Sequence, residues 1–331
     1  MQFPYTKFLN FGEFFNKKNE DFVAINVGNY HVKGLIVKSG KPTDYFLKER
    51  KDISTTLKEI WQEKKITTDN VAISVKDPTT LTRYFPFPKI DKKKLRQSLF
   101  YELNKHIPFS PEEVYFDFAL LGDASPTQSW LLLAVAKKEF INNILDIFTR
   151  EKLNVTYISL DSICLVNFFL HYYDQHKKTN TCLLDVGSSF STLTILRSGV
   201  PFLTRDISFS AKDVFGVISH IKNIPLPEIE KQLLLPNNQE LLELAQDSLT
   251  NLCKEVKNSF DYFEVNKGEH IEQMYLSGGL TYLAGVEAIF KDYLGIETAL
   301  LSNTQAAAAG FSDEAFQKLK RSFTVAFGLL V

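Results

Sequence analysis

A chain of 331 residues and 37.8 kDa is long enough to bury a large core, and its length predicts two or three domains. Apolar residues make up 44% and charged residues 23%, which is the balance of an ordinary globular protein. The net charge of −1 gives no electrostatic footprint for nucleic acid, and the three widely spaced cysteines predict neither disulfides nor a zinc site.

Residues 1–20 form an arm that is rich in phenylalanine, with spacing that roughly fits one face of an amphipathic helix. Such an arm could contact a membrane surface, contact a partner, or pack back onto the protein, and we favour the last interpretation. No apolar run approaches the roughly 18 residues of a membrane span, and no secretory signal is evident, so we expect a cytoplasmic protein. The apolar residues of the arm are Phe3, Phe8, Leu9, Phe11, Phe14 and Phe15.

Residues 22–42 predict a β-hairpin with a short polar bend. The first strand is apolar, and Gly28 allows a ligand to approach the backbone closely. Lys33 follows the bend and points either at a phosphate or at solvent. The candidate ligand contacts of this hairpin are Asn26, Gly28, Asn29, Tyr30 and Lys33.

A helix over 57–65 and a strand over 71–75 complete a small α/β unit. From residue 80 to about 155 the pattern then predicts a compact inserted α+β module, with strands at 82–85, 114–121 and 130–136 and helices at 92–105 and 138–151. A strand over 155–160 and an apolar helix over 161–173 return to the first half of the protein. Asp161 begins that helix, where Asp is commonly an N-cap.

A second hairpin at 182–203 repeats the layout of the first. Asp185 ends its first strand and could hold a hydrated Mg²⁺, because magnesium prefers oxygen ligands and keeps its water. Backbone N–H groups at Gly187 and nearby hydroxyls could donate to phosphate oxygens. Taken alone, this pattern also fits an ordinary turn. The hydroxyls belong to Ser188, Ser189 and Ser191.

The rest of the chain is mainly helical, with helices predicted at 211–222, 227–235, 240–265 and 280–294 and a short strand at 297–301. Before the fourth helix, a strand ends at Gly278 and Gly279, where a flat base could lie against the backbone. Two such hairpins about 160 residues apart predict two related half-domains that clamp a phosphate chain between their turns.

The order of the two hairpins and the turn Ser277-Gly278-Gly279 resembles the actin-like ATPase superfamily, which includes actin, the Hsp70 ATPase domain, sugar kinases and FtsA. Within it, residues 105–117 and 185–207, the latter including Arg205, resemble the PilM family of cytoplasmic type IV pilus assembly proteins. The resemblance covers residues 20–330. It implies an α/β fold of two related lobes, with an inserted α+β subdomain replacing the small subdomain of actin.

The resemblance also implies the domain organisation and the function. We expect an arm over 1–20, a first lobe over 21–178 with the insertion at about 80–155, and a second lobe over 179–331 with a helical subdomain at about 211–270. The family implies a nucleotide-binding scaffold that docks the cytoplasmic tail of a PilN-like inner-membrane protein, in a groove between the first subdomain and the inserted module. Other pilus platform proteins and self-association are further options. The alternatives are an active ATPase, or a GspL-like or FtsA-like platform or filament protein.

ATP and Mg²⁺ are the cofactors that the family implies, with Asp185 as the metal-holding and catalytic residue and Asp161 near the attacking water. Lys254, Glu255 and Lys257 fall in the segment that resembles the ribose-contacting helix, although such charges are also typical of a solvated helix face. Asn26 departs from the Asp that relatives commonly carry, which removes a charge beside the metal, and the bulky Tyr30 and His31 crowd the first turn. We therefore expect at most a weak ATPase.

Overall fold

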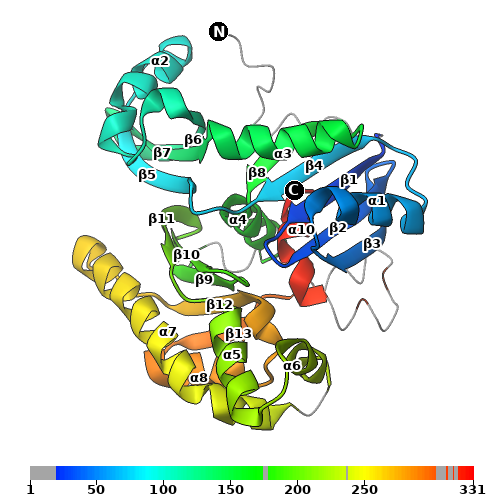
Figure 1. Ribbon diagram of the computed structural model, residues 1–331. Coiled ribbons are helices and arrows are strands. Elements are labelled where there is room, and N and C mark those ends of the chain that lie inside the picture. The colour runs from blue at the N-terminus through cyan, green and yellow to red at the C-terminus, as the bar shows by residue number, and fades with distance from the viewer. Residues whose placement is uncertain (1–19, 174–177, 236–237, 303–310, 312–315, 317–319) are drawn as a thin grey trace. The chain divides into compact units, whose positions relative to one another are not determined.

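The computed structural model describes residues 20–331 except 174–177, 236–237, 303–310, 312–315 and 317–319. The chain divides into two compact units (Figure 1). Unit 1 contains the residues up to Cys164 together with Val325–Val331, and unit 2 contains Leu165–Thr324. The division lies within helix α4 (Asp161–Tyr172) rather than at residue 178, and the last seven residues return to unit 1. Most of the phenylalanine-rich arm lies outside the described residues.

Unit 1 is built on a five-stranded sheet with the order β3-β2-β1-β4-β8. The strands are β1 (Phe22–Val27), β2 (His31–Lys38), β3 (Lys41–Glu49), β4 (Asn70–Val75) and β8 (Asn154–Leu160). The chain pairs β1, β2 and β3 as antiparallel hairpins, whereas β4 and β8 run parallel to β1. The sequence analysis did not identify β3.

One face of this sheet packs on helices α1 (Ile53–Lys64) and α3 (Lys138–Arg150). Because side chains alternate between the two faces of a strand, Val23, Ile25 and Val27 of β1 enter this core. Asn26 therefore faces the other side, where α4 begins. Helix α10 (Thr324–Gly328) packs closely on α4, because a Cβ on Gly328 would lie 1.9 Å from the carbonyl oxygen of Cys164.

The inserted module is a three-stranded antiparallel sheet with the order β5-β7-β6, accompanied by helix α2 (Lys92–Glu102). Its strands are β5 (Thr80–Pro88), β6 (Val114–Ser125) and β7 (Gln128–Lys137). The two faces of strand β7 pack in two different hydrophobic cores. Leu131, Leu133 and Val135 pack with α2, and the alternate residues pack with the five-stranded sheet. Helix α3 packs with the five-stranded sheet, so the module ends near Lys137 rather than near 155.

Unit 2 repeats the strand arrangement of unit 1. Its sheet has the order β11-β10-β9-β12-β13, with β9 (Thr181–Val186), β10 (Ser191–Arg197) and β11 (Val200–Ile207) as antiparallel hairpins. Strands β12 (Gln273–Gly278) and β13 (Glu297–Leu300) run parallel to β9. Strand for strand, this matches unit 1, as expected for two related half-domains.

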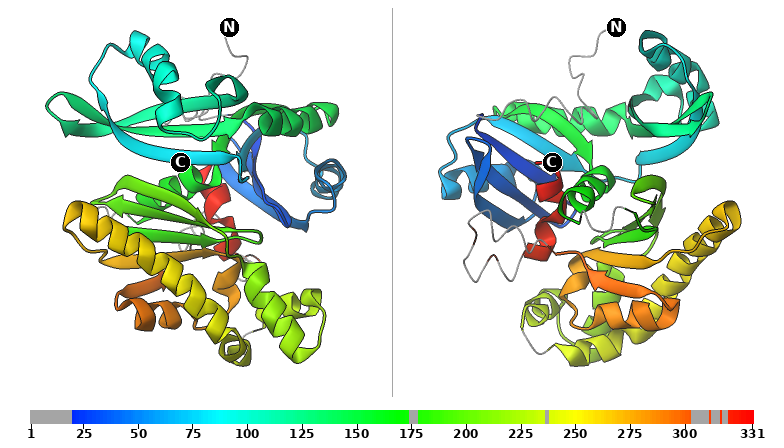
Figure 2. Two further views of the ribbon diagram at one scale, coloured as in Figure 1. Left: turned by 60° about the vertical axis from the view of Figure 1, so that its left-hand side comes forward. Right: turned by 180° about the vertical axis from the view of Figure 1, so that it is seen from behind.

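Helices of unit 2 bury the apolar side chains of β9 and β10. They are α5 (Ala211–Lys222), α6 (Leu226–Leu233), α7 (Gln239–Lys267) and α8 (Val286–Leu294), and Figure 2 shows α7 in yellow, packed alongside α5 and α8. The predicted helix over 280–294 is interrupted. A short 3-10 turn covers Gly279–Tyr282, and Gly285 adopts a φ of 84° before α8 begins, a conformation that interrupts helical hydrogen bonding.

Candidate nucleotide-binding turns

The first candidate site is the bend between β1 and β2 in unit 1. A Cβ on Gly28 would lie 2.6 Å from the carbonyl oxygen of His31, so this bend requires glycine. Arg50, just beyond β3, fixes the bend from outside: its backbone N–H donates to the Tyr30 carbonyl oxygen at 2.8 Å and its Nη1 donates to the Gly28 carbonyl oxygen at 3.1 Å. Sequence analysis missed Arg50, because this contact depends on the pairing of β2 with β3.

Asn26 is directed inward and holds Asp161. The Asn26 side chain is 2% exposed, and its Nδ2 lies 2.9 Å from both carboxylate oxygens of Asp161 and 2.9 Å from the Ser74 hydroxyl oxygen. A carboxylate only accepts hydrogen bonds, so the amide nitrogen must face it. Asp161 is buried as well, and Asn26 stabilises its charge there. The polar groups of this half-site are thus bonded to one another.

Two aromatic rings follow the bend. The rings of Tyr30 and His31 meet edge to face, with centroids 4.6 Å apart and an interplanar angle of 81°. Burial, assisted by the nearby charge of Lys33, lowers the pKa of His31 to about 4. His31 is therefore neutral at pH 7 and brings no positive charge to a phosphate. Lys33 is half-buried on β2, and Asn29 is exposed at the bend.

The second candidate site is built where three segments of unit 2 meet. The carbonyl oxygen of Gly187, in the bend after β9, accepts the backbone N–H of Ala211 at 2.8 Å, which joins the bend to the start of α5. Gly279 lies against the same residue, because a Cβ on Gly279 would be 3.6 Å from the Ala211 Cβ. Helix α5 is capped by Ser210, whose hydroxyl accepts from the Asp213 N–H at 3.3 Å.

Gly278 is required for strand β12 to approach Asp185. It has a φ of 86°, and a Cβ there would lie 2.4 Å from the Val186 carbonyl oxygen and 2.9 Å from Asp185 Oδ1. In register, Ser277 pairs with Asp185. The structure therefore brings together the predicted residues Asp185, Gly187, Gly278 and Gly279.

The three serines of the second bend differ in exposure. Ser189 is exposed and Ser188 is half-buried, so their hydroxyls lie at the surface of the bend. Ser191 is fully buried, and its hydroxyl donates to the Phe209 carbonyl oxygen at 2.6 Å. The Ser191 proton is thus used within the fold, and the predicted phosphate contact would require breaking this hydrogen bond.

The predicted charges on α7 have partners inside unit 2. Arg205 Nη2 lies 2.6 Å from Glu255 Oε2, which ties α7 to β11. Lys257 Nζ lies 2.5 Å from Asp261 Oδ1, one helical turn further on. Lys254 is exposed. For Glu255 and Lys257 a ribose would have to compete with these ion pairs.

The residues of the unit 2 bend fit a phosphate group with its cation. The bend at Gly187 lies beside the N-terminus of α5, which contributes the positive end of a helix dipole. The N–H groups of Ser210, Ala211 and Asp213 at that helix start are bonded within the fold, so N–H donors to a phosphate would come from the bend itself. Asp185 supplies a carboxylate at the end of β9. Among the described residues, no three His, Cys, Asp or Glu side chains gather into a metal site, so a magnesium ion here would depend on Asp185, water and the phosphates themselves.

Comparison with known proteins identifies the family and the fold. A family model described as type IV pilus assembly protein PilM matches residues 24–331. A chain of the solved PilM-PilN type IV pilus biogenesis complex is similar with a TM-score of 0.82, covering 94% of this chain and 98% of that chain at 20% sequence identity. The ethanolamine utilization protein EutJ from Carboxydothermus hydrogenoformans is similar with a TM-score of 0.59, covering 94% and 89% at 11% identity. These similarities confirm the predicted actin-like ATPase fold.

Proposed function

The chain belongs to the family of type IV pilus assembly protein PilM, and from this premise we propose that it is a cytoplasmic, nucleotide-binding scaffold of a pilus assembly platform. In this role it holds the cytoplasmic tail of a PilN-like inner-membrane protein, and the partner keeps it at the inner membrane. The observation that carries the proposal is the family match over residues 24–331, together with the 0.82 TM-score to a chain of a PilM-PilN complex. No helix in the described part of the chain is long and apolar enough to cross a bilayer.

We propose that the unit 2 bend binds ATP with Mg²⁺. When bound, the metal would neutralise phosphate charge. The unit 2 bend supports this role, because Asp185, the bend at Gly187 and the start of α5 converge there. Ser188 and Ser189 would donate to phosphate oxygens, and Gly278 and Gly279 would let a base approach the backbone.

Hydrolysis is at most slow in this proposal. The unit 1 bend carries the neutral amide of Asn26 rather than a carboxylate, so it supplies no negatively charged metal ligand. That amide is already bonded to Asp161, which leaves the Asp161 carboxylate engaged. A group held in this way is poorly placed to accept a proton from an attacking water. Nucleotide then acts on conformation or stability rather than through rapid turnover.

The partner tail is proposed to bind beside the inserted module. The module has its own apolar core and carries exposed apolar side chains, with Tyr101 73% and Leu120 43% exposed. These two side chains lie on α2 and β6 of the module, and exposed apolar side chains can contribute to an interaction surface. A tail that adds contacts to this surface would join the scaffold to the membrane.

The partner proposal is tested by titrating the full chain with a synthetic peptide that carries the N-terminal tail of a PilN-like protein from the same organism. Leu120→Arg, on the module, should weaken binding about tenfold or more. Leu235→Arg, after α6 and 59% exposed, is the matched control and should bind as the wild type does. Equal binding by both variants, or no binding by the folded wild type, would contradict the proposal.

A further inference from the structure

Arg50 is a half-buried cation at the unit 1 bend. It directly follows β3, and its Nη1 donates to the Gly28 carbonyl oxygen at 3.1 Å. Burial lowers the pKa of its guanidinium, and no carboxylate among the described residues lies close enough to raise that pKa again. A guanidinium stays charged in proteins and has more N–H donors than this one bond uses. The bend therefore carries a positive charge together with donors that remain available to a ligand.

The acidic residues on either side of Arg50 do not neutralise it. Glu49 is exposed at the end of β3. Asp52 is the N-cap of α1, where its Oδ1 accepts the Thr55 N–H at 2.9 Å and its carbonyl oxygen accepts the Thr56 N–H at 3.0 Å. The Asp52 carboxylate is therefore engaged in capping α1, and the start of this helix is bonded to its own cap rather than to the bend.

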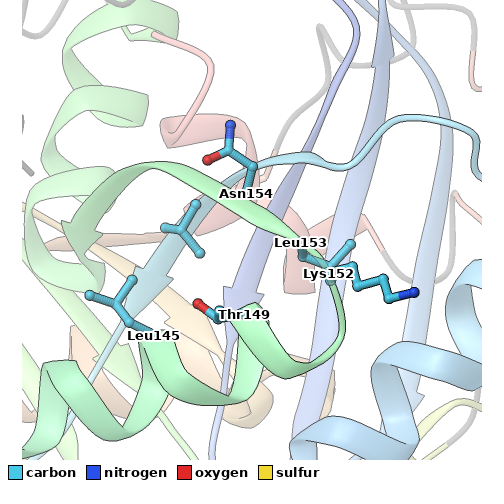
Figure 3. Close-up of a pocket in the computed structure, with 6 residues that line it drawn as sticks. Leu145, Thr149, Lys152, Leu153 and Asn154 are labelled. Atoms are coloured by element: carbon cyan, nitrogen blue, oxygen red, sulfur yellow. The ribbon is translucent and has the colours of Figure 1, made fainter.

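An ordinary surface cation of unit 1 shows how Arg50 differs. Lys152 lies beside the hollow at the end of α3 and is exposed. Figure 3 shows its side chain extending away from Leu145 and Thr149, which line the same hollow. Water solvates such an ammonium group, so it needs no anion. The guanidinium of Arg50 has lost part of its water through burial and gains more from an anion.

The equivalent glycine of unit 2 is bonded in a different way. Gly28 and Gly187 directly follow β1 and β9, and the carbonyl oxygen of each accepts a hydrogen bond from the segment beyond the third strand of its unit. In unit 2 the donor is the backbone N–H of Ala211, the first residue of α5, at 2.8 Å. In unit 1 the donor is the side chain of Arg50. A guanidinium thus takes the position that a helix start holds in the other unit.

This exchange changes the charge at the bend. A helix N-terminus is equivalent to about half a positive charge, whereas a guanidinium has a full one. The planar fork of a guanidinium also matches two oxygens of a phosphate group. His31 does not supply this charge, because its pKa is lowered to about 4 and it is neutral at pH 7. Arg50 therefore gives the unit 1 bend the chemistry of an anion site.

We propose that Arg50 binds a phosphate group at the unit 1 bend, in the position that corresponds to the start of α5 in unit 2. Its Nη1 holds the Gly28 carbonyl oxygen, and its other donors bind phosphate oxygens. This inference rests on the proposed nucleotide binding and names a residue of unit 1 that recognises phosphate. The terminal phosphate of a nucleotide and free inorganic phosphate share this chemistry, and the experiment distinguishes them.

Calorimetric titration of the full chain with ATP and Mg²⁺, with ADP and Mg²⁺, and with inorganic phosphate tests the proposal. Arg50→Gln removes the charge, but its amide can still donate to the Gly28 carbonyl oxygen and support the bend. We expect it to weaken binding of at least one of these ligands about tenfold or more, because hydrogen bonds to charged groups are strong. Arg83→Gln, at an exposed arginine of the inserted module, is the matched control and should change affinity less than about twofold.

Two further measurements separate the charge of Arg50 from a merely structural role. Arg50→Lys keeps the charge without the planar fork and should bind with intermediate affinity. Raising the salt concentration should weaken binding by the wild type more than binding by Arg50→Gln, since an ionic contact is screened. A damaged bend would instead weaken binding by the same factor at every salt concentration. Thermal unfolding checks that each variant is folded.

The pattern of losses identifies the source of the phosphate. A loss for ATP that exceeds the loss for ADP assigns Arg50 to the terminal phosphate of the nucleotide. An equal loss for ATP and ADP assigns it to a phosphate that both nucleotides carry. Binding of inorganic phosphate that depends on Arg50 assigns it to a free anion.

Wild-type affinity of folded Arg50→Gln for all three ligands, or equal losses in Arg50→Gln and Arg83→Gln, would overturn the inference. The proposed function would then still stand if the wild type binds ATP and Asp185→Ala does not. Phosphate binding that depends on Arg50, in a chain that fails to bind ATP, would support the inference and contradict the proposed nucleotide binding. No binding of any ligand by the folded wild type would overturn both.

Discussion

The two units share the same strand arrangement, but the side chains at their corresponding bends differ in chemistry. Asn26 and Asp185 hold equivalent positions at the end of β1 and β9, and the bends at Gly28 and Gly187 follow at the same spacing. The next turns also correspond: Ser39-Gly40 and Ser198-Gly199 both have positive φ at each residue. In each case a proline stands two residues after the glycine, and the register of the hairpin shifts nearby. The repeat therefore extends to the geometry of individual turns.

The difference lies in where the polar side chains are directed. In unit 1, Asn26 bonds to Asp161 and to Ser74, the residue beside it on β4. In unit 2, Ser277 is the residue beside Asp185 on β12, but its hydroxyl pairs with Thr324 Oγ1 at 2.9 Å. In unit 1, Asn26 and Asp161 form a buried amide–carboxylate pair, whereas in unit 2 the carboxylate of Asp185 lies beside Gly278. The same strand arrangement thus surrounds different side-chain chemistry in the two units.

The largest effect is expected from Gly278→Ala in unit 2. The new Cβ would meet the Val186 carbonyl oxygen at 2.4 Å in a backbone conformation with a φ of 86°. We expect the free energy of unfolding to fall by about 4 kcal/mol, with loss of nucleotide binding. Gly279→Ala, with an ordinary 3.6 Å contact, is the control and should be nearly neutral in chemical denaturation. Equal stability of the two variants would be inconsistent with this packing.

Asn26→Asp makes unit 1 resemble unit 2 and should destabilise the protein by about 3 kcal/mol at pH 7, because two buried carboxylates would face each other. Lowering the pH should reduce this loss, since protonating one carboxylate removes the repulsion. Thermal unfolding at several pH values measures it. Adding Asp161→Asn restores an amide–carboxylate pair and should recover most of the stability. No recovery would argue against direct contact.

His31 should give unit 1 a pH dependence. Burial, with help from Lys33, lowers its pKa from 6.5 to about 4, so the unfolded chain takes up the proton first as the pH falls. Stability from this group is therefore complete above pH 6.5 and lost between pH 6.5 and 4, by about 2 kcal/mol after allowance for partial exposure. His31→Gln should flatten that part of the curve of unfolding free energy against pH. An unchanged slope of unfolding free energy against pH would show that a group other than His31 causes the pH dependence.

The smallest effect is expected from Arg50→Ala, which removes the side-chain hydrogen bond to the Gly28 carbonyl oxygen while leaving the backbone bond to Tyr30. We expect a loss of about 1 kcal/mol in unfolding free energy. Arg83→Ala is the comparison, because the exposed Arg83 bonds only to the carbonyl oxygen of its neighbour Thr82 among the described hydrogen bonds, and it should change stability by less than about 0.5 kcal/mol. A larger loss for Arg83→Ala would contradict this order.

The local features of the fold could be predicted from the sequence, because they depend on neighbouring residues. The two hairpins follow from apolar runs and glycine bends, and the resemblance predicted the two lobes. The break before α8 was missed, since Gly285 inside an apolar run resembles continuous helix. The extent of the inserted module was also misjudged, because α3 is amphipathic wherever it packs, and only the tertiary structure assigns its apolar face to the five-stranded sheet.

The residue types of the candidate site could be predicted from the sequence, but the contacts between these residues could not. Asp185, Gly278 and Gly279 carry recognisable signals, and the structure brings them together. The bond from Asn26 to Asp161 joins residues far apart in the chain, and no local pattern encodes it. Ser74 could have been found by comparing the strands that pair with β1 and β9, since Ser277 occupies the corresponding place. The pairing of Glu255 with Arg205 likewise required the packing of α7 on β11.

Calorimetric titration of the full chain with ATP and Mg²⁺ tests the central claim most directly. We predict that the wild type binds, that Asp185→Ala weakens binding at least about tenfold, and that Asp247→Ala, which removes an exposed carboxylate from α7, leaves it unchanged. Asp185→Ala binding as tightly as the wild type, or no binding heat from any folded variant, would contradict the assignment of the nucleotide site to the unit 2 bend.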